Sequence, residues 1–285
     1  MAEDHQALHG HELALRFRCG EEEHQARLLG ILSLPRRPAP RGVLIVTGGP
    51  QYRAGSHRQF TLLARVLAAQ GFPVLRFDYR GMGDSEGERR DYTAIAADID
   101  SALIQFFHSV PALREVVLWG LCDGATAAAC HAPRDPRIAG LVLLNPWVRS
   151  PAGLARTTLR HYYLRRLVQR DFWRKLAAGR FQLASSLASL RSTAADAALV
   201  EAELPQADLY HALHRFRGKV CIILSGDDLG AREWDELIKA SGAWRALAGS
   251  PQWRQVRIAG ANHTFASAAW RAQVEQACGD WMASW

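Results

Sequence analysis

A cysteine stands between two glycines in the stretch Gly120-Leu121-Cys122-Asp123-Gly124, after the apolar run Val116–Trp119 and before a block of alanines. A nucleophile held on a sharp strand-to-helix turn has this layout, because side chains two positions away would meet neighbouring backbone. The helix that follows directs its free N–H groups at the reacting atom. The pattern therefore predicts a nucleophile elbow with Cys122 in place of the usual serine. The alternative is a cysteine packed as a small hydrophobic residue.

A thiol nucleophile needs a base, and usually an acid that orients the base. In this layout the chain order is nucleophile, acid and histidine, each on a loop after a strand. Asp227 and Asp228 follow the run "CIILSG", and His263 follows "QVRIAGAN". We predict His263 as the base and Asp228 as the acid, because a residue just beyond the strand-end glycine tends to point back toward the site. Asp227 is the alternative acid, and otherwise a turn or capping residue.

The chemistry also requires donors for a tetrahedral oxyanion. The elbow presents the backbone N–H of Asp123, and the loop after Val43–Val46 should supply the second donor. Pro50 has no N–H, so Gly49 is the predicted donor, with Gln51 behind it. The glycines of this loop are also consistent with a simple tight turn. His57 begins the next predicted helix beside the loop and is a further candidate for the pocket.

The predicted course is attack on an acyl carbonyl, formation of a thioester, and release by water activated by His263. The resting protonation state of Cys122 stays open, because His263 and the helix favour the thiolate whereas Asp123 opposes it. No metal or organic cofactor is required. The loop "RGMGDSEG" lacks the ending and the glycine spacing of a nucleotide-binding loop.

Apolar runs that alternate with helical patterns predict an α/β fold with a mostly parallel central sheet flanked by helices. The chain should begin with an antiparallel pair over Glu12–Arg18 and Gln25–Leu34. Further strands are predicted at 43–49, 72–78, 115–120, 138–146, 219–226 and 255–260. Helices are predicted at 57–70, with Ser56 as its cap and Gly71 at its end, at 91–110, after the elbow, and at the end of the chain.

The strand pattern disappears between Trp147 and Arg217, in a stretch too long for a loop in a compact domain. We interpret residues 147–217 as an inserted helical cap, and residues 1–146 with 218–285 as the core. Arginines from Arg149 to Arg180 punctuate this cap. They form a solvated basic face, or they receive an acidic acyl or saccharide substrate or anionic lipid head groups in peripheral contact with a membrane. Without a recognition motif, no nucleic-acid partner is expected.

The composition fits one large domain with an insertion, since 48% of the 285 residues are hydrophobic and 22% are charged. The net charge of +7 permits acidic partners without naming one. Five scattered cysteines without C-x-x-C spacing argue against a disulfide framework or a zinc site. No membrane-spanning run or secretory signal is visible, so the cytoplasm is the expected location. The oligomeric state stays open.

The stretches "FDYRGMGDSEG", "GLCDG" and "GANHTF" together resemble the α/β-hydrolase superfamily, over nearly the whole chain outside the cap. More narrowly, "GGPQYRAGSHRQF", "RFDYRGMGDSEG" and "WGLCDGA" resemble the exosortase A system-associated hydrolase, type 1, a bacterial group encoded near protein-sorting and exopolysaccharide genes. The resemblance implies Cys122 as nucleophile, Asp228 as acid and His263 as base, with Gly49 and Asp123 as oxyanion donors. Cysteine for serine departs from most of the superfamily, as in dienelactone hydrolase-like enzymes.

Three hypotheses follow. The chain hydrolyses an ester or thioester through a Cys-His-Asp triad, or the same site transfers the acyl group to an alcohol or amine. The third is a non-catalytic relative that keeps the fold as an interaction module of an exopolysaccharide or protein-sorting system.

Overall fold

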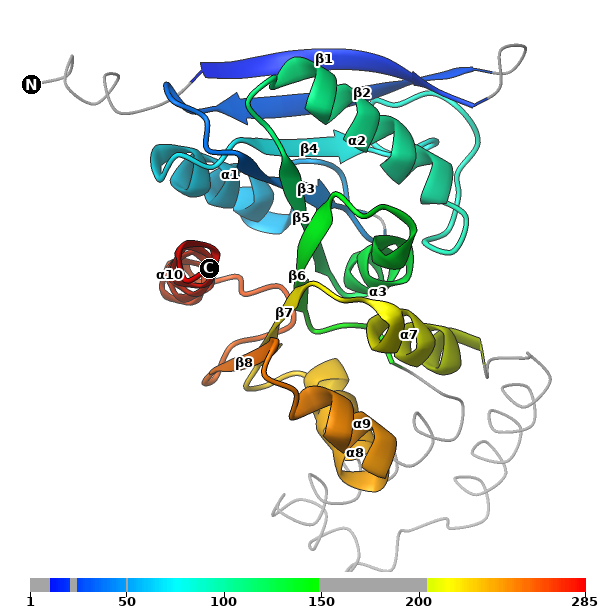
Figure 1. The fold of residues 1–285 in the computed structure, drawn as a ribbon, viewed down its shortest axis with the longest axis vertical. Coiled ribbons are helices and arrows are strands. Elements are labelled where there is room, and N and C mark those ends of the chain that lie inside the picture. Colours follow the sequence, from blue (N-terminus) through cyan, green and yellow to red (C-terminus); the bar gives the residue numbers. More distant parts are fainter. Residues whose placement is uncertain (1–10, 21–24, 50, 149–203) are drawn as a thin grey trace, which may run out of the picture. The chain divides into compact units, whose positions relative to one another are not determined.

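The central element is an eight-stranded sheet in the order β1-β2-β4-β3-β5-β6-β7-β8 (Figure 1). The computed structural model describes residues 11–20, 25–49, 51–148 and 204–285. The strands are β1 (His11–Cys19), β2 (Ala26–Leu34), β3 (Arg41–Val46), β4 (Val74–Asp78), β5 (Glu115–Leu121), β6 (Ile138–Leu144), β7 (Lys219–Ser225) and β8 (Trp253–Ile258). The described α-helices are α1 (Gln59–Ala69), α2 (Ala96–Ser109), α3 (Asp123–His131), α7 (Leu204–Arg215), α8 (Leu229–Ala240), α9 (Gly242–Ala248) and α10 (Ala268–Ala283).

Strand direction sets where the loops of the sheet gather. β2 runs antiparallel to β1 and β4, whereas β4, β3, β5, β6, β7 and β8 are parallel to one another. The carboxyl ends of the parallel strands therefore meet at one edge, where open α/β sheets bind their ligands. The loops after β3, β5, β7 and β8 carry Gly49, Cys122, Asp228 and His263 to that edge. The predicted fold class is confirmed.

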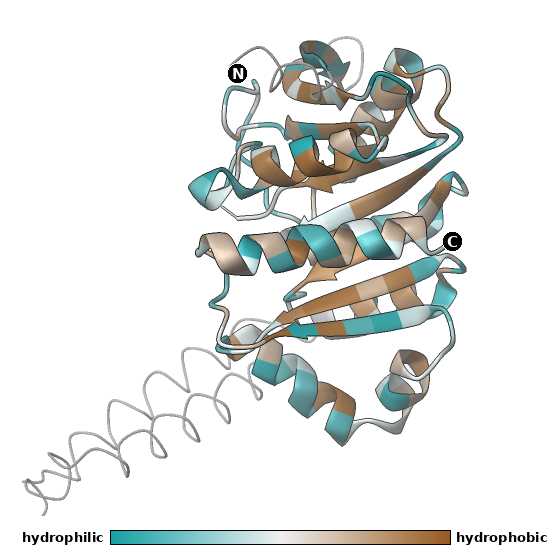
Figure 2. Ribbon diagram, turned by 90° about the vertical axis from the view of Figure 1, so that its left-hand side faces the viewer, coloured by the Kyte–Doolittle hydropathy of each residue, from teal (hydrophilic) through white to brown (hydrophobic). Residues whose placement is uncertain are grey.

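Helices cover both faces of the sheet, with α1 and α10 on one face and α2 and α3 on the other (Figure 1). Strands buried on both faces read as continuous apolar runs rather than alternating ones. Every residue of β5 from Val116 to Leu121 is buried, and so are most residues of β3, β6 and β7. Figure 2 shows the hydrophobic residues gathered on the central strands, with hydrophilic residues on the outer faces of the helices.

The local predictions have mixed outcomes. The antiparallel pair at the start of the chain is confirmed by the register from His11–Leu34 to Cys19–Ala26. Gly71 ends α1 with a positive φ of 96°, as the glycine pattern predicts. Ser56 as the cap of α1 is wrong: α1 begins at Gln59 without a side-chain cap, and the Ser56 hydroxyl accepts a hydrogen bond from Gln51 instead.

Two helices lie where the sequence predicts no element. Residues 229–248 form α8 and α9, each capped by a side-chain oxygen, from Asp228 and Ser241 respectively.

Helix α2 begins at Ala96 rather than near Asp91, because the Asp91 carboxylate accepts the N–H and hydroxyl of Thr93 and closes a turn there.

The chain divides into two units, residues 1–147 with 209–285, and residues 148–208. Nearly all of the second unit, which includes the arginines of the predicted cap, lies outside the described residues. The boundaries 147–217 for a cap therefore stay a prediction. None of the helices in the described part of the chain is long and apolar enough to cross a bilayer.

Candidate active site

Cys122 sits on a strained turn between β5 and α3. Its φ of 59° and ψ of −124° lie outside the regions that a residue with a side chain ordinarily adopts. Such a conformation costs about 1–3 kcal/mol and persists only where the surroundings fix it. The N–H of Cys122 donates to the Leu144 carbonyl at 2.9 Å, which ties the turn to β6. The cysteine is half-buried and packs against the core beneath the sheet edge.

The two flanking glycines permit this turn. A Cβ at Gly120 would lie 2.5 Å from the carbonyl oxygen of Gly124. A Cβ at Gly124 would lie 2.6 Å from the carbonyl oxygen of Val46, on the neighbouring strand β3. Any larger residue at either position would push the turn away from the sheet. The turn therefore has the tight strand-to-helix geometry that the sequence pattern predicts, and the role of Cys122 as a nucleophile stays a prediction.

The structure brings His263 and Asp228 together across the ends of β7 and β8. His263 Nδ1 lies 3.1 Å from Asp228 Oδ1. The other oxygen, Oδ2, accepts the N–H of Ala231 at 3.1 Å and caps α8, which fixes the carboxylate. The alternative acid faces away: the Asp227 side chain is 76% exposed and pairs with Arg232, whereas the Asp228 side chain is 11% exposed.

The charges of these groups stabilise one another. Hydrogen bonding to Asp228, followed by interaction with Cys122, raises the pKa of His263 from 6.5 to about 10. Burial alone would raise the pKa of Asp228, but the hydrogen bond and charge of His263 hold it below its usual range. The interactions of His263 with Asp228 and Cys122 thus favour the charged form of the imidazole.

A buried polar clamp holds the loops that carry Asp228 and His263. Asn145, at the end of β6, donates to the Ser225 hydroxyl at 2.6 Å and to the His263 carbonyl at 3.1 Å. Its carbonyl oxygen accepts the Ser225 N–H at 2.8 Å, and the Ser225 hydroxyl donates to the Asn262 carbonyl at 2.9 Å. Asn145 and Ser225 are almost fully buried, so the network is shielded from water.

The oxyanion side of the site is occupied by a side chain of the protein. The Asp123 carboxylate accepts the Gly49 N–H at 2.7 Å through Oδ2 and the Gly124 N–H at 3.0 Å through Oδ1. Burial raises the pKa of Asp123, and the N–H groups of Gly49, Gly124 and Asp123 itself oppose that rise. The two N–H groups predicted to hold an oxyanion therefore both face the Asp123 carboxylate.

The loop after β3 is fitted closely around that carboxylate. A Cβ at Gly48 would lie 2.1 Å from Asp123 Oδ1, so only glycine fits there. The Tyr79 hydroxyl donates to the Gly49 carbonyl at 3.2 Å and fixes the next peptide. Burial, followed by the charge of Asp123, raises the pKa of Tyr79 to about 12, so this hydroxyl stays protonated and remains a donor.

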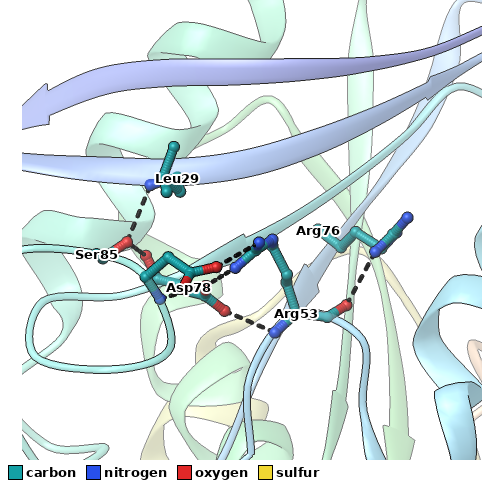
Figure 3. A network of polar contacts seen from close by, with 6 residues as sticks. Leu29, Arg53, Arg76, Asp78 and Ser85 are labelled. Carbon is teal, nitrogen blue, oxygen red and sulfur yellow. Dashed lines mark hydrogen bonds and ion pairs between the residues drawn. The ribbon is translucent and has the colours of Figure 1, made fainter.

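A second buried carboxylate holds the other end of the same loop. Asp78, at the end of β4, accepts the backbone N–H of Arg53 at 2.6 Å and pairs with its guanidinium (Figure 3). Arg53 also pairs with Asp84 at 2.6 Å. The Ser85 hydroxyl donates to the Asp78 carbonyl at 2.6 Å and accepts the Leu29 N–H at 2.9 Å. The loop "RGMGDSEG" thus serves as a support for the site.

The remaining predicted pocket residues are not brought into the acid–base group. The N–H of Gln51 closes a turn by donating to the Gly48 carbonyl at 3.2 Å, and its side chain donates to Ser56 at 3.1 Å. His57 is exposed, with a left-handed φ of 52° in a short 3₁₀ turn. Three contributors were not expected from the sequence: the Asp123 side chain, Asn145 and Ser225. A polar residue just after the apolar run of β6 is the signal that would have found Asn145.

An open cleft of about 390 Å³ adjoins the oxyanion side. Its lining comes from the loops after β3, β4 and β5, and consists of Gly49, Tyr79, Arg89, Arg90, Asp91, Tyr92 and Asp123.

Comparison with known families decides the kinship of the chain. The family model for serine aminopeptidases of family S33 matches residues 38–219. This chain belongs to that family. The match runs from just before β3 to the start of β7 and so includes the turn after β5, where Cys122 stands in a family named for a serine. The finding agrees with the α/β-hydrolase architecture described above.

Similar proteins differ in what their names say they do. The quorum-quenching protein AidA of Acinetobacter baumannii and the polyketide transferase grgF of a Penicillium species are each 31% identical over 93 residues, 31% of each chain. The chain thus spans about a third of the length of these curated relatives. The Pyrococcus furiosus esterase Pf2001 superposes with a TM-score of 0.66 at 13% identity, over 98% of this chain and 95% of that one. The structure of GrgF from Penicillium superposes with a TM-score of 0.60 at 17% identity, over 96% and 97%.

Proposed function

We propose that this chain is an esterase-like α/β hydrolase that cleaves an ester or thioester through a thioester on Cys122. The observation that carries the proposal is the pairing of the strained Cys122 turn with a His263 ring whose pKa both Asp228 and Cys122 raise. Strained backbone and strongly shifted pKa values gather at functional sites. A cysteine nucleophile works as a reduced thiol, which fits the cytoplasm as the proposed location.

In the proposed course, the Cys122 sulfur attacks the acyl carbon while His263 holds the thiol proton. The carbonyl electrons move onto oxygen and return when the leaving group departs with the proton from His263. Water, deprotonated by His263, then attacks the thioester, and the acid product leaves as the thiol is restored. Asp228 keeps the imidazole oriented and stabilises its charged form throughout.

The oxyanion step requires a rearrangement. The N–H groups of Gly49 and Asp123 are the proposed donors, but the Asp123 carboxylate faces both in the resting site. A substrate oxygen therefore replaces this carboxylate as it becomes charged. A hydrogen bond to a charged group is worth about 1.5–3 kcal/mol, so the exchange adds a barrier that a substrate must offset by binding elsewhere.

Acyl transfer is the second candidate, and the likeness to a polyketide transferase favours it. The first half-reaction is the same for both functions. In transfer, an alcohol or amine takes the place of water at the thioester, and the product is a new ester or amide. The narrower kinship with exosortase-associated hydrolases is likewise a proposal, supported by the sequence stretches that surround Gly49, Asp78 and Cys122.

Selective labelling combined with burst kinetics tests the proposal. Iodoacetamide near neutral pH should alkylate Cys122 ahead of Cys130, which is also partly exposed, while Cys19, Cys221 and Cys278 are buried. An activated p-nitrophenyl ester should give a burst of p-nitrophenol equal to the enzyme concentration. Product analysis with added alcohols and amines then separates transfer from hydrolysis.

Two variants serve as controls for this test. Cys122→Ala should lose both the selective label and the burst, and His263→Ala should lose the burst. Equal labelling of Cys122 and Cys130, with no burst from any ester, would reject catalysis and favour the non-catalytic interaction protein.

A further inference from the structure

The cleft beside the oxyanion loop has an unusual charge arrangement. Two neighbouring arginines, Arg89 and Arg90, line it, and both are exposed. Within the described part of the chain, neither side chain forms an ion pair. Three other arginines around this loop have carboxylate partners at short range: Arg27 with Glu86, Arg53 with Asp84, and Arg80 with Asp98.

The backbone at Arg89 is held in place by contacts with neighbouring segments. A Cβ at Gly81 would lie 2.3 Å from the Arg89 backbone, so the two segments touch closely. The Gly81 N–H donates to the Glu86 carbonyl at 3.1 Å, and the Glu86 N–H donates to Arg27 of β2 at 2.9 Å. The loop from Tyr79 to Arg89 is therefore closed on itself and tied to the sheet.

The position of the arginines connects them to the chemistry. Gly49 and Asp123 line the same cleft, so one end of it is the proposed oxyanion site. The charge of Arg89 acts on Tyr79, the residue that donates to the Gly49 carbonyl. A cleft of about 390 Å³ has room for a short acyl chain but not for a large polymer.

The carboxylates in the cleft do not neutralise the arginines by direct pairing. Asp123 accepts backbone N–H groups from Gly49 and Gly124, and Asp91 accepts the N–H and hydroxyl of Thr93. Asp91 is thus engaged on its own loop, and Asp123 is engaged by its own turn and by the loop after β3. Tyr79 stays neutral because its pKa is raised to about 12. Among the described residues of the cleft, the guanidinium groups of Arg89 and Arg90 are donors suited to an incoming anion, since such groups bind carboxylate or phosphate oxygens in pairs.

We propose that Arg89 and Arg90 form a subsite for the anionic end of the acyl substrate, so that the preferred substrate is an acyl chain ending in a carboxylate or phosphate. The inference rests on the proposed function, because it assumes that the acyl carbon lies at Cys122. Binding at the two arginines would supply the free energy that moves the Asp123 carboxylate off the Gly49 N–H.

Matched esters test the subsite. Mono-p-nitrophenyl adipate carries a terminal carboxylate, p-nitrophenyl hexanoate is its neutral counterpart of equal chain length, and the p-nitrophenyl ester of 6-phosphooxyhexanoate carries a phosphate. We expect kcat/KM for at least one anionic ester to exceed that for hexanoate about tenfold, chiefly through KM. The ratio of kcat/KM for the two anionic esters shows whether the subsite prefers a carboxylate or a phosphate.

The decisive variant is Arg89→Gln/Arg90→Gln, which should abolish the preference and leave hexanoate within twofold of the wild-type value. Arg36→Gln/Arg37→Gln is the matched control, since it changes another exposed pair of neighbouring arginines, in the segment that precedes β3. This control should keep the preference intact. A wild-type protein without preference, or a preference that survives in Arg89→Gln/Arg90→Gln, would overturn the subsite.

A binding readout separates the failure of the subsite from the failure of catalysis. Adipic acid monoamide should protect Cys122 from iodoacetamide better than neutral hexanamide does, and the Arg89→Gln/Arg90→Gln variant should lose this difference. If no ester acylates Cys122 but the protection remains, the subsite stands and the proposed hydrolysis fails. If hexanoate turns over without any anion preference or differential protection, hydrolysis stands and the subsite fails.

Discussion

The two sides of the site differ in whether their hydrogen-bonding groups are already arranged for a substrate. On the acid–base side, Asp228 and His263 are 3.1 Å apart, and the Asn145–Ser225 clamp holds their loops. On the oxyanion side, the N–H of Gly49 is taken by the Asp123 carboxylate at 2.7 Å. In the proposed mechanism, one side is assembled for proton transfer, while the other must release a carboxylate of the protein before it can receive a substrate oxygen.

This contrast separates the reactivity of the thiol from the rate of acyl transfer to it. A preassembled acid–base pair makes the thiol reactive toward small electrophiles regardless of their shape. An occupied oxyanion site makes acyl transfer depend on substrate binding, because only a substrate with further contacts offsets the exchange. We therefore expect strong reactivity with iodoacetamide but slow reaction with small neutral esters.

The acid–base side can be broken by Asp228→Asn. The amide cannot stabilise the charged imidazole, so the burst rate should fall by roughly ten-thousandfold, as expected when the orienting acid of a triad is replaced by its amide. Asp227→Asn is the matched control on the adjacent residue, and it should change the rate less than twofold. Equal losses in the two variants would show that Asp228 has no special part in the site.

The oxyanion side can be freed by Asp123→Ala. Removing the carboxylate releases the Gly49 N–H, so acylation by neutral p-nitrophenyl esters should become about 10- to 100-fold faster, the factor equivalent to about 1.5–3 kcal/mol. Stopped-flow measurement of the burst gives this rate. Asp123→Asn keeps an oxygen acceptor without the charge and should give an intermediate rise. A lower acylation rate in both variants would mean that Asp123 supports the acylation step instead of opposing it.

The clamp on the acid–base side can be loosened by Asn145→Ala. The loss leaves the buried Ser225 N–H without its acceptor and frees the His263 loop, so kcat should fall about fivefold with KM unchanged. The thermal midpoint should fall too. Glu115→Gln, which weakens an ion pair with Arg41 at the opposite edge of the sheet, is the control for stability loss alone. If both variants lower kcat alike, the clamp has no positioning role.

The smallest effect concerns pH and stability. The pKa of His263 is raised from 6.5 to about 10, so its contribution to folding is fully present below about pH 6.5 and is lost as the pH rises through 10. The difference in thermal midpoint between wild type and His263→Gln should therefore be largest near pH 6 and shrink toward pH 10. A difference that grows over this range would contradict the charged pairing.

The sequence predicts the scaffold better than the contacts. The glycines around Cys122, and the positions of Asp228 and His263 after apolar runs, follow from local rules and from the chain order of the parallel strands. The direction of the Asp123 side chain depends on how a loop 74 residues earlier closes over it. Asn145 likewise acts across three loops. Contacts of this kind, between segments far apart in the sequence, depend on tertiary packing, which a pattern along the chain does not encode. Helix α8 is capped by Asp228 and is amphipathic, with Ala231 and Trp234 buried, so the sequence carries a helical pattern there that the prediction did not use.

Trapping of the acyl group tests the central claim most directly. Wild-type protein and Asp123→Ala should be mixed with an activated acyl ester, quenched in acid and measured by intact mass, followed by peptide mapping. The account predicts one added acyl group on the peptide that carries Cys122, removable by neutral hydroxylamine as a thioester is, and formed faster in Asp123→Ala. An acyl group found only on lysines, or no adduct in either protein, would contradict it.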